Sequence, residues 1–279
     1  MLMLNTSSDH FAVNNDTTPN PEMLTSDAAY YEASYAQYMA NRTGPLTEAH
    51  GNAAAFLPLS IIDPNYRQYA INATMQPAAE YLPTVYNNSI TLLAGYMAQR
   101  TILAARFMTN TSAVMELPFG GTAVQAVALE KPLSRGTITI NSTDPAAPPV
   151  VDYGALTNPI DAYMAAAMLN YTRKFMETPA MQSLGPVELS PGPAYITTDE
   201  LISVIRSTVI TPTFAHPSCS CSMMPLMLGG VVSPELLVYG VQNLSIVDAS
   251  IIPMIPATHL QSTVYAIAEK AADIIKARA

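Results

Sequence analysis

The sequence predicts an α/β fold, or an α+β fold if the chain is taken by itself. Three observations support this class: a hydrophobic content of 49% over 279 residues, several segments with helical periodicity, and short β-branched stretches between proline-rich loops. The hydrophobic content is sufficient for a packed core and excludes a disordered chain. The length allows one large domain or two small ones.

The predicted elements begin with residues 1–25, which are polar and rich in Pro, Asn and Thr and therefore predict a flexible N-terminal segment. Apolar spacing with few breakers predicts helices over residues 28–38, 89–108, 160–176 and 199–209. Asp161 places negative charge in the first turn of the third of these helices, and Thr198 can cap the fourth.

Two strands and a final helix complete the prediction. Residues 136–140 alternate with β-branched side chains, and residues 245–247 are expected to form a short buried strand. The final helix is predicted over residues 262–276, where Val264, Ile267 and Ala271 lie on one apolar face.

Charge and hydropathy exclude several classes of function. Charged residues make up 12% of the chain and the net charge is −9, which disfavours nucleic-acid binding because phosphate recognition needs clustered Lys and Arg. No run of eighteen apolar residues occurs, so no membrane span is expected. The N-terminus lacks the basic and apolar regions of a signal peptide.

Asn-x-Ser/Thr sequons nevertheless indicate a secreted glycoprotein. Nine of the fifteen Asn residues lie in sequons: Asn5, Asn15, Asn41, Asn72, Asn87, Asn110, Asn141, Asn170 and Asn243. Chance at this Ser and Thr content would give about two or three. We expect glycans at several sites, but not at Asn141 and Asn243, which fall in strand-like stretches. A polar-rich composition without glycans is the alternative.

Two of the four histidines lie in well-punctuated loops near the C-terminus. His216 begins the sequence HPSCSCSM, and His259 lies in ATHLQ at 257–261. Between them run GVVSPEL at 230–236, VYGVQNL at 238–244 and DAS at 248–250. Imidazole titrates near neutrality and can accept a hydroxyl proton. His10 and His50 lie in no such block and are expected to be structural.

Cys219 and Cys221 are the only cysteines. A Cys-x-Cys pair on an extended segment is poorly placed for a disulfide. Two ligands without a histidine cluster are weak evidence for zinc, so no metal site is predicted.

The region from 216 to 275 resembles the C-terminal signature of the glucose–methanol–choline (GMC) flavoprotein oxidoreductases, because it contains these blocks in the family's order. A helix with the sequence AEKAAD at 268–273 follows, as in the family. PLSRG at 132–136 begins a weaker resemblance, and NRTGPLT at 41–47 resembles a substrate-side segment of secreted fungal members. Cys219 departs from the family's usual Gly or Ser, and Ser233 from its usual Asp.

The resemblance implies an FAD cofactor and assigns roles to individual residues. His216 occupies the position of the catalytic base, and His259 that of its partner, which is His or Asn in the family. Asp248 and Ala249 would contact the flavin cofactor, although Asp248 could simply cap its own turn. Leu260 and Gln261 would approach the cofactor through backbone N–H groups at a helix N-terminus.

The resemblance also implies a domain division. Residues 26–215 would form part of a substrate-binding domain with a mixed sheet and helices against one face. Residues 216–279 would complete an FAD-binding domain. The Gly-x-Gly-x-x-Gly fingerprint of that domain does not occur here, so the chain is expected to be the C-terminal part of a longer enzyme.

The implied activity is FAD-dependent oxidation of a small-molecule alcohol, with dioxygen or another electron acceptor reoxidising the flavin. Two alternatives stay open. One is a non-redox lyase or cyclase of the same family, in which FAD is structural. The other is a truncated fragment without activity of its own.

Overall fold

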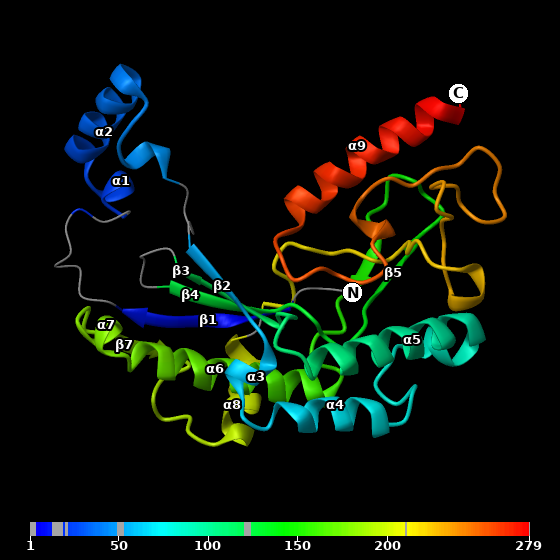
Figure 1. Cartoon of the computed structure of the whole chain (residues 1–279), viewed down its shortest axis with the longest axis horizontal. Coiled ribbons are helices and arrows are strands. Elements are labelled where there is room, and N and C mark those ends of the chain that lie inside the picture. The colour runs from blue at the N-terminus through cyan, green and yellow to red at the C-terminus, as the bar shows by residue number, and fades with distance from the viewer. Residues whose placement is uncertain are drawn as a thin grey trace.

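The computed structural model describes residues 4–12, 19, 22–48, 53–119, 124–209 and 211–278. Within these ranges a five-stranded sheet has the order β2-β3-β4-β1-β7. Its strands are β1 (Leu4–Ala12), β2 (Ala53–Leu57), β3 (Met115–Phe119), β4 (Val124–Leu129) and β7 (Val187–Ser190). Helices lie along one side of this sheet, below it in Figure 1. The predicted α/β class and the helices on one face are therefore confirmed.

The sheet corrects two expectations. All of its strand pairs are antiparallel, where a mixed sheet was expected, so the α+β description fits this part of the chain. Residues 4–12 were predicted to be flexible, but they form β1 between β4 and β7. The polar sequence LNTSSDHFA does not by itself predict a strand. Hydrogen bonding to strands on both sides stabilises it, since strand formation depends strongly on context. The side chain of His10 and the whole of His50 lie outside the described structure.

The helical layer contains α3 (Leu59–Ile62), α4 (Tyr66–Met75), α5 (Ile90–Phe107), α6 (Pro159–Met176) and α8 (Thr198–Val204). Their apolar faces and the inner side of β3 and β4 form the main hydrophobic core, in which Phe107, Leu129 and Leu169 are fully buried. The predicted helices at 89–108 and 160–176 are thus found within one residue at each end.

Side-chain caps define where α6 and α8 begin. Asn158 caps α6 by accepting from the backbone N–H of Ile160. The cap of α8 is Thr197, one residue before the predicted Thr198, because Glu200 completes a capping box with it. The helix then ends at Val204, and residues 205–209 continue it as a π-helical turn.

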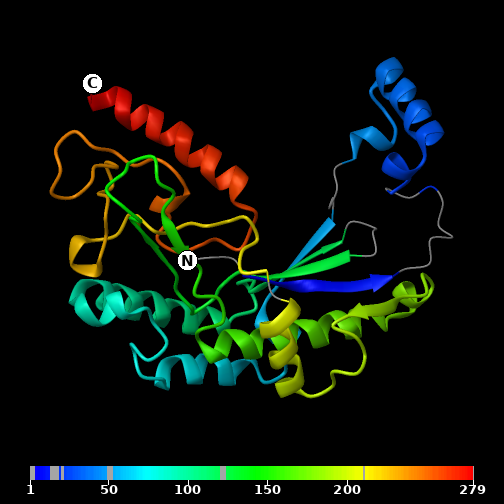
Figure 2. The ribbon, with the colours of Figure 1, turned by 180° about the vertical axis from the view of Figure 1, so that it is seen from behind.

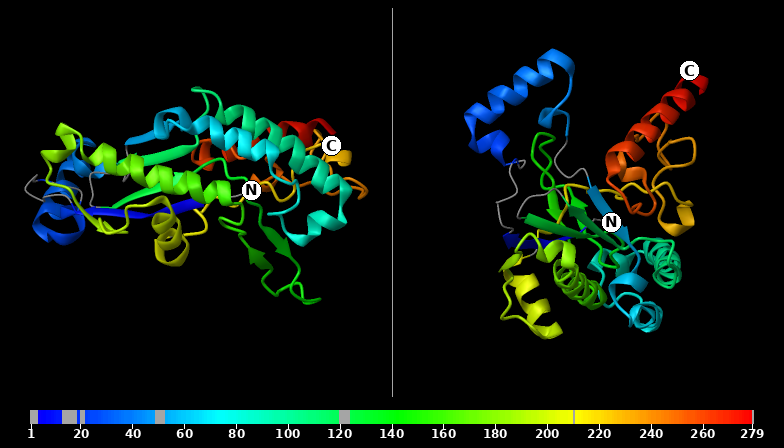
Figure 3. Two further views of the ribbon diagram at one scale, coloured as in Figure 1. Left: turned by 90° about the horizontal axis from the view of Figure 1, so that it is seen from below. Right: turned by 60° about the vertical axis from the view of Figure 1, so that its left-hand side comes forward.

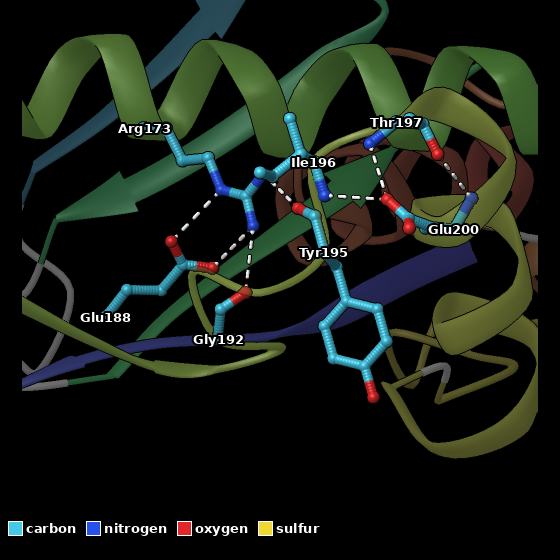
Figure 4. A network of polar contacts seen from close by, with 7 residues as sticks. All are labelled: Arg173, Glu188, Gly192, Tyr195, Ile196, Thr197 and Glu200. Atoms are coloured by element: carbon cyan, nitrogen blue, oxygen red, sulfur yellow. Dashed lines mark hydrogen bonds and ion pairs between the residues drawn. The ribbon is translucent and has the colours of Figure 1, made fainter.

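Arg173 on α6 fixes the segment between β7 and α8, as Figure 4 shows. Its guanidinium donates to both carboxylate oxygens of Glu188, at 3.0 and 2.8 Å, and to the carbonyls of Gly192 and Tyr195. A bidentate pair with two further backbone acceptors holds the irregular loop against the helix.

Asp161 has a larger role than its predicted effect on the helix dipole. It is fully buried and accepts hydrogen bonds from the backbone N–H groups of Leu133 and Ser134, at 2.8 and 2.7 Å. Burial raises the pKa of its carboxyl, and these hydrogen bonds oppose the shift. Arg135 in the same turn donates to Gln99 on α5, and Gln99 donates to the carbonyl of Pro253. This chain of contacts connects α6 and α5 to the C-terminal segment.

The C-terminal segment, residues 211–278, contains little regular structure before α9 (Leu260–Arg278). Its short elements are the 3-10 turns Leu226–Leu228 and Ala249–Ile251. The strand expected at 245–247 is absent, because Ser245 makes only an isolated bridge to Leu237. Figure 2 shows α9 across the molecule from the helical layer, and the final helix predicted at 262–276 is confirmed with slightly wider bounds.

The remaining elements lie outside these layers. They are α1 (Met23–Ser26), α2 (Ala28–Asn41), α7 (Pro179–Gln182), the 3-10 turns Pro45–Thr47 and Thr84–Asn88, and the hairpin of β5 (Thr137–Thr139) and β6 (Val150–Asp152). Figure 3 shows the β5–β6 hairpin projecting from the body of the molecule. None of the helices in the described part of the chain is long and apolar enough to cross a membrane.

Candidate active site

The structure brings His216 and His259 together. Their imidazole rings have centroids 5.5 Å apart and stand nearly perpendicular, at 84°. His216 lies in the loop that follows residue 211, and His259 directly precedes α9. Two loops that are 43 residues apart therefore present their histidines side by side.

The environment of His216 fixes which ring nitrogen is free. Its Nδ1 is in hydrogen-bonding contact with the carbonyl oxygen of Phe214. A carbonyl can only accept, so in the neutral ring Nδ1 carries the proton and Nε2 keeps a lone pair. The geometry leaves Nε2 as the nitrogen that can take up a proton.

A short backbone ladder aligns the loop of His216 with the predicted flavin-contacting turn. The N–H groups of Cys219, Cys221 and Met223 donate to the carbonyls of Ala249, Ser250 and Ile251, at 3.1, 2.9 and 2.8 Å. Cys219 has a φ of 68°, in the left-handed region that favours glycine. A side chain at this φ carries a steric cost that glycine would not, so Cys219 occupies a strained backbone position two residues before Cys221.

Glu116 on β3 is a site residue that the sequence analysis missed. Its Oε1 lies 2.5 Å from Nε2 of His259, and the carboxylate is fully buried whereas 55% of the histidine side chain is exposed. Met115 and Leu117 point into the main core, so Glu116 faces the opposite side of the sheet. A lone acidic residue in an apolar strand was the signal in the sequence, but its partner lies 143 residues away.

Phe214 was also missed, although it precedes His216 by only two residues. Its ring centroid lies 5.8 Å from that of His216 and 5.7 Å from that of His259. The phenyl ring therefore packs on both imidazoles and restricts their rotation.

The four predicted cofactor-contacting residues lie in the turn at 248–249 and at the start of α9. The Asp248 side chain is exposed and accepts from the N–H of Ser250 at 2.8 Å, which is the capping role given above as the alternative. Ala249 packs in a small cluster with Phe214, Cys219 and Leu260. Leu260 is buried and Gln261 is exposed, and both lie in the first turn of α9.

A cavity of about 300 Å³ adjoins the residues that follow His216. Pro217, Ser218, Cys219 and Ser220 line one side of it, and α5 and the β5–β6 hairpin supply other walls. Neither histidine is among its lining residues. The two imidazoles therefore contact each other outside the lining of this cavity.

Comparisons with known proteins agree on one family. A sequence profile described as GMC oxidoreductase matches residues 132–268. The dehydrogenase xptC of Emericella nidulans is 40% identical over 186 residues, which cover 67% of this chain and 30% of that protein. Patulin synthase of Penicillium expansum is 35% identical over 217 residues, which cover 76% of this chain and 32% of that enzyme.

Solved structures show the same relationship. An FAD-dependent oxidoreductase from Chaetomium thermophilum superposes with a TM-score of 0.91 at 33% identity, over 99% of this chain and 48% of that one. A fungal aryl-alcohol oxidase superposes with a TM-score of 0.86 at 32% identity, over 99% of this chain and 47% of that one. The chain spans about a third of the length of the two curated relatives and about half of these two structures.

Proposed function

Since this chain belongs to the GMC oxidoreductase family, we propose that it supplies the proton-handling residues of an FAD-dependent alcohol oxidation. The substrate would be a small molecule with a CH–OH group, and dioxygen or another acceptor would reoxidise the cofactor. The observation that carries the proposal is the contact between His216 and His259, together with the hydrogen bonds that leave one nitrogen of each ring available.

The residues around the pair fit a flavin. The first N–H groups of α9 have no acceptor within the helix, and they lie directly after His259, where Gln261 is exposed. Such a helix start stabilises negative charge, as a reduced flavin carries. Leu260 and Gln261 would hold the cofactor through these N–H groups, with Asp248 and Ala249 beside them. The flavin, when bound, supplies the acceptor for the hydride that leaves the substrate carbon.

The roles of the two histidines follow from their free nitrogens. His216 takes the hydroxyl proton on Nε2, because its Nδ1–H is already donated to Phe214. Nδ1 is the nitrogen of His259 left to face the substrate, because its Nε2 is engaged by Glu116, and it would hold the hydroxyl oxygen when it carries a proton to donate. Glu116 and Phe214 would position the imidazoles without touching the substrate.

The domain division is part of the same proposal. Residues 26–215 would contribute to the substrate-binding domain, and residues 216–279 would provide the histidines and the flavin contacts. In this arrangement the site lies where β3 meets the start of α9, so that both parts are needed to complete it.

The experiment is replacement of His216 by Ala in the full-length protein loaded with FAD. We expect kcat to fall by about 10²–10⁴-fold, the usual contribution of a positioned base, while the thermal midpoint stays within a degree or two. Bleaching of the flavin absorbance on addition of an alcohol distinguishes oxidation from lyase or cyclase chemistry. An unchanged kcat would show that His216 is not the base. A lowered midpoint with full activity in the folded fraction would make it a structural residue.

We also propose that the protein is secreted and carries N-glycans. Six sequon asparagines in the described structure are exposed: Asn41, Asn72, Asn87, Asn110, Asn141 and Asn243. Asn141 follows β5, and Asn243 lies in a turn with a φ of 59°. Neither residue is therefore in a strand, which was the reason for expecting no glycan at these two sites. Asn170 is half-buried on α6 beside the fully buried Thr172. Glycopeptide mapping of protein from a fungal host should find modification at the exposed sites and none at Asn170.

A further inference from the structure

A second buried carboxyl lies next to the partner of His259. Glu116 on β3 pairs with Ala128 on β4, and Glu130 follows Ala128 by two residues, so both glutamates face the same side of the sheet. The N–H of Glu130 donates to the carbonyl of Val114 at 2.8 Å, which extends the β3–β4 ladder to this position. Diagonal neighbours of this kind are within reach of long side chains. Glu116 and Glu130 are both 0% exposed.

Glu116 and Glu130 have too few hydrogen-bond partners for both carboxyls to be ionised. Oε1 of Glu116 is taken by His259, whereas Oε2 of Glu116 and both oxygens of Glu130 have no hydrogen-bond partner among the described residues. Among the described residues, the cation that acts on Glu130 is the Lys131 ammonium, which itself lies near Arg106 on α5. The side chains of β1 that adjoin this part of β4 lie outside the described structure. A second charge without a partner in a buried site is costly, and the usual outcome is that one of the two carboxyls keeps its proton.

The electrostatics identify which group that is. Burial and then the nearby Glu116 carboxylate raise the pKa of Glu130 to about 8, and Lys131 opposes the shift only in part. Glu116 has His259 as a partner, whereas neither carboxyl oxygen of Glu130 has a partner among the described residues.

We propose that Glu130 is a positioning residue of the histidine pair, held as a neutral carboxylic acid so that Glu116 alone presents negative charge to His259. The structural part of this inference stands without the proposed function, and only its consequence for turnover rests on it. When Glu130 loses its proton to solvent in alkaline solution, a second negative charge arises behind Glu116. That charge makes the electrostatic potential at the His259 ring more negative and changes how the ring holds a hydroxyl oxygen.

The first test does not depend on turnover. Infrared spectroscopy of the full-length, FAD-loaded protein should show a protonated-carboxyl carbonyl band at pH 6.5 that disappears as the pH is raised through about 8. Glu130→Gln should abolish this band, whereas Glu235→Gln, at an exposed position, should leave it intact. Absence of a titrating band, or its survival in Glu130→Gln, would overturn the proposal.

The second test is the pH profile of turnover with an excess of alcohol. In the wild type, kcat should change between pH 7 and 9 by about two- to tenfold, and Glu130→Gln should remove this step because its amide stays neutral. Glu116→Gln is the contrasting variant, because it should lower kcat at every pH. A Glu130→Gln profile that keeps the alkaline step would refute the positioning role. If the protein proves not to oxidise alcohols, the infrared band still decides the protonation state of Glu130.

Discussion

The helical layer and the C-terminal segment differ in what stabilises each of them internally. The helical layer packs the apolar faces of α5 and α6 against β3 and β4 in one continuous core of buried side chains. The C-terminal segment has two small clusters, and only Leu260 and Ala271 are buried on the whole of α9. Its loops are aligned by backbone hydrogen bonds and by contacts to Gln99 and Gly95 on α5.

The candidate active site lies where these two regions meet. The rigid region contributes the buried Glu116, and the segment with little core of its own contributes His216 and His259. A firmly packed strand can keep a buried carboxylate in place, while loops supply nitrogens that substrates can reach. Four further predictions test this contrast between the packed core and the loops of the C-terminal segment.

The largest effect is expected from truncation in the main core. Leu169→Ala should lower the free energy of unfolding by about 2–5 kcal/mol, because Leu169 is fully buried among close-packed neighbours. The matched change Leu260→Ala, in a cluster of three buried residues, should cost about 2 kcal/mol, the lower end of that range, because the small cluster can collapse around the loss. Chemical denaturation measures both, and equal losses would contradict the contrast between the regions.

The stability of the protein should fall as the pH rises from about 5 to about 8, through Glu130. Its pKa is raised from 4.5 to about 8 on folding, so over this interval the unfolded chain loses the proton while the folded chain keeps it. Deprotonation therefore favours unfolding, by an amount on the order of 2–4 kcal/mol that builds up above the unfolded pKa and is complete only above the folded pKa of about 8. Denaturation of wild type and Glu130→Gln at both pH values isolates this term, which the variant should lack.

Gly95→Ala should loosen the contact between α5 and the C-terminal segment. A Cβ at this position would lie 2.1 Å from the carbonyl oxygen of Leu228, so one backbone must move. We expect a loss of about 1–3 kcal/mol in stability, and a decrease in kcat larger than an exposed substitution on the same helix would give. Ala substitution of the exposed Thr101 serves as that control. Full activity with normal stability would show that the close approach is dispensable.

The smallest effect concerns His259. His259→Asn should retain about tenfold more activity than His259→Ala, because the amide can still hold a hydroxyl oxygen by a hydrogen bond. Neither change should alter the thermal midpoint by more than a few degrees, since more than half of the histidine side chain is exposed. Steady-state kinetics decide this, and equal activities would assign His259 a role other than holding the substrate.

The sequence by itself determined the features that depend on local pattern. The helical periodicity at 89–108 and 160–176 defined two helices of the core, and α9 was predicted because its apolar face repeats every three to four residues. The loops of His216 and His259 were identified as a pair through the blocks between them, and the structure places the two rings in contact.

Only the tertiary structure decided what depends on residues distant in sequence. Residues 4–12 form β1 because β4 and β7 pair with them on both sides. The local preferences of this polar segment do not predict a strand. Asp161 is a buried acceptor for a turn 27 or 28 residues away, and Glu116 meets His259 across 143 residues. Burial and charge pairing arise only when strands and loops from separate parts of the chain come together, so Glu116 could not be identified as a partner of His259 from its own surroundings in the sequence.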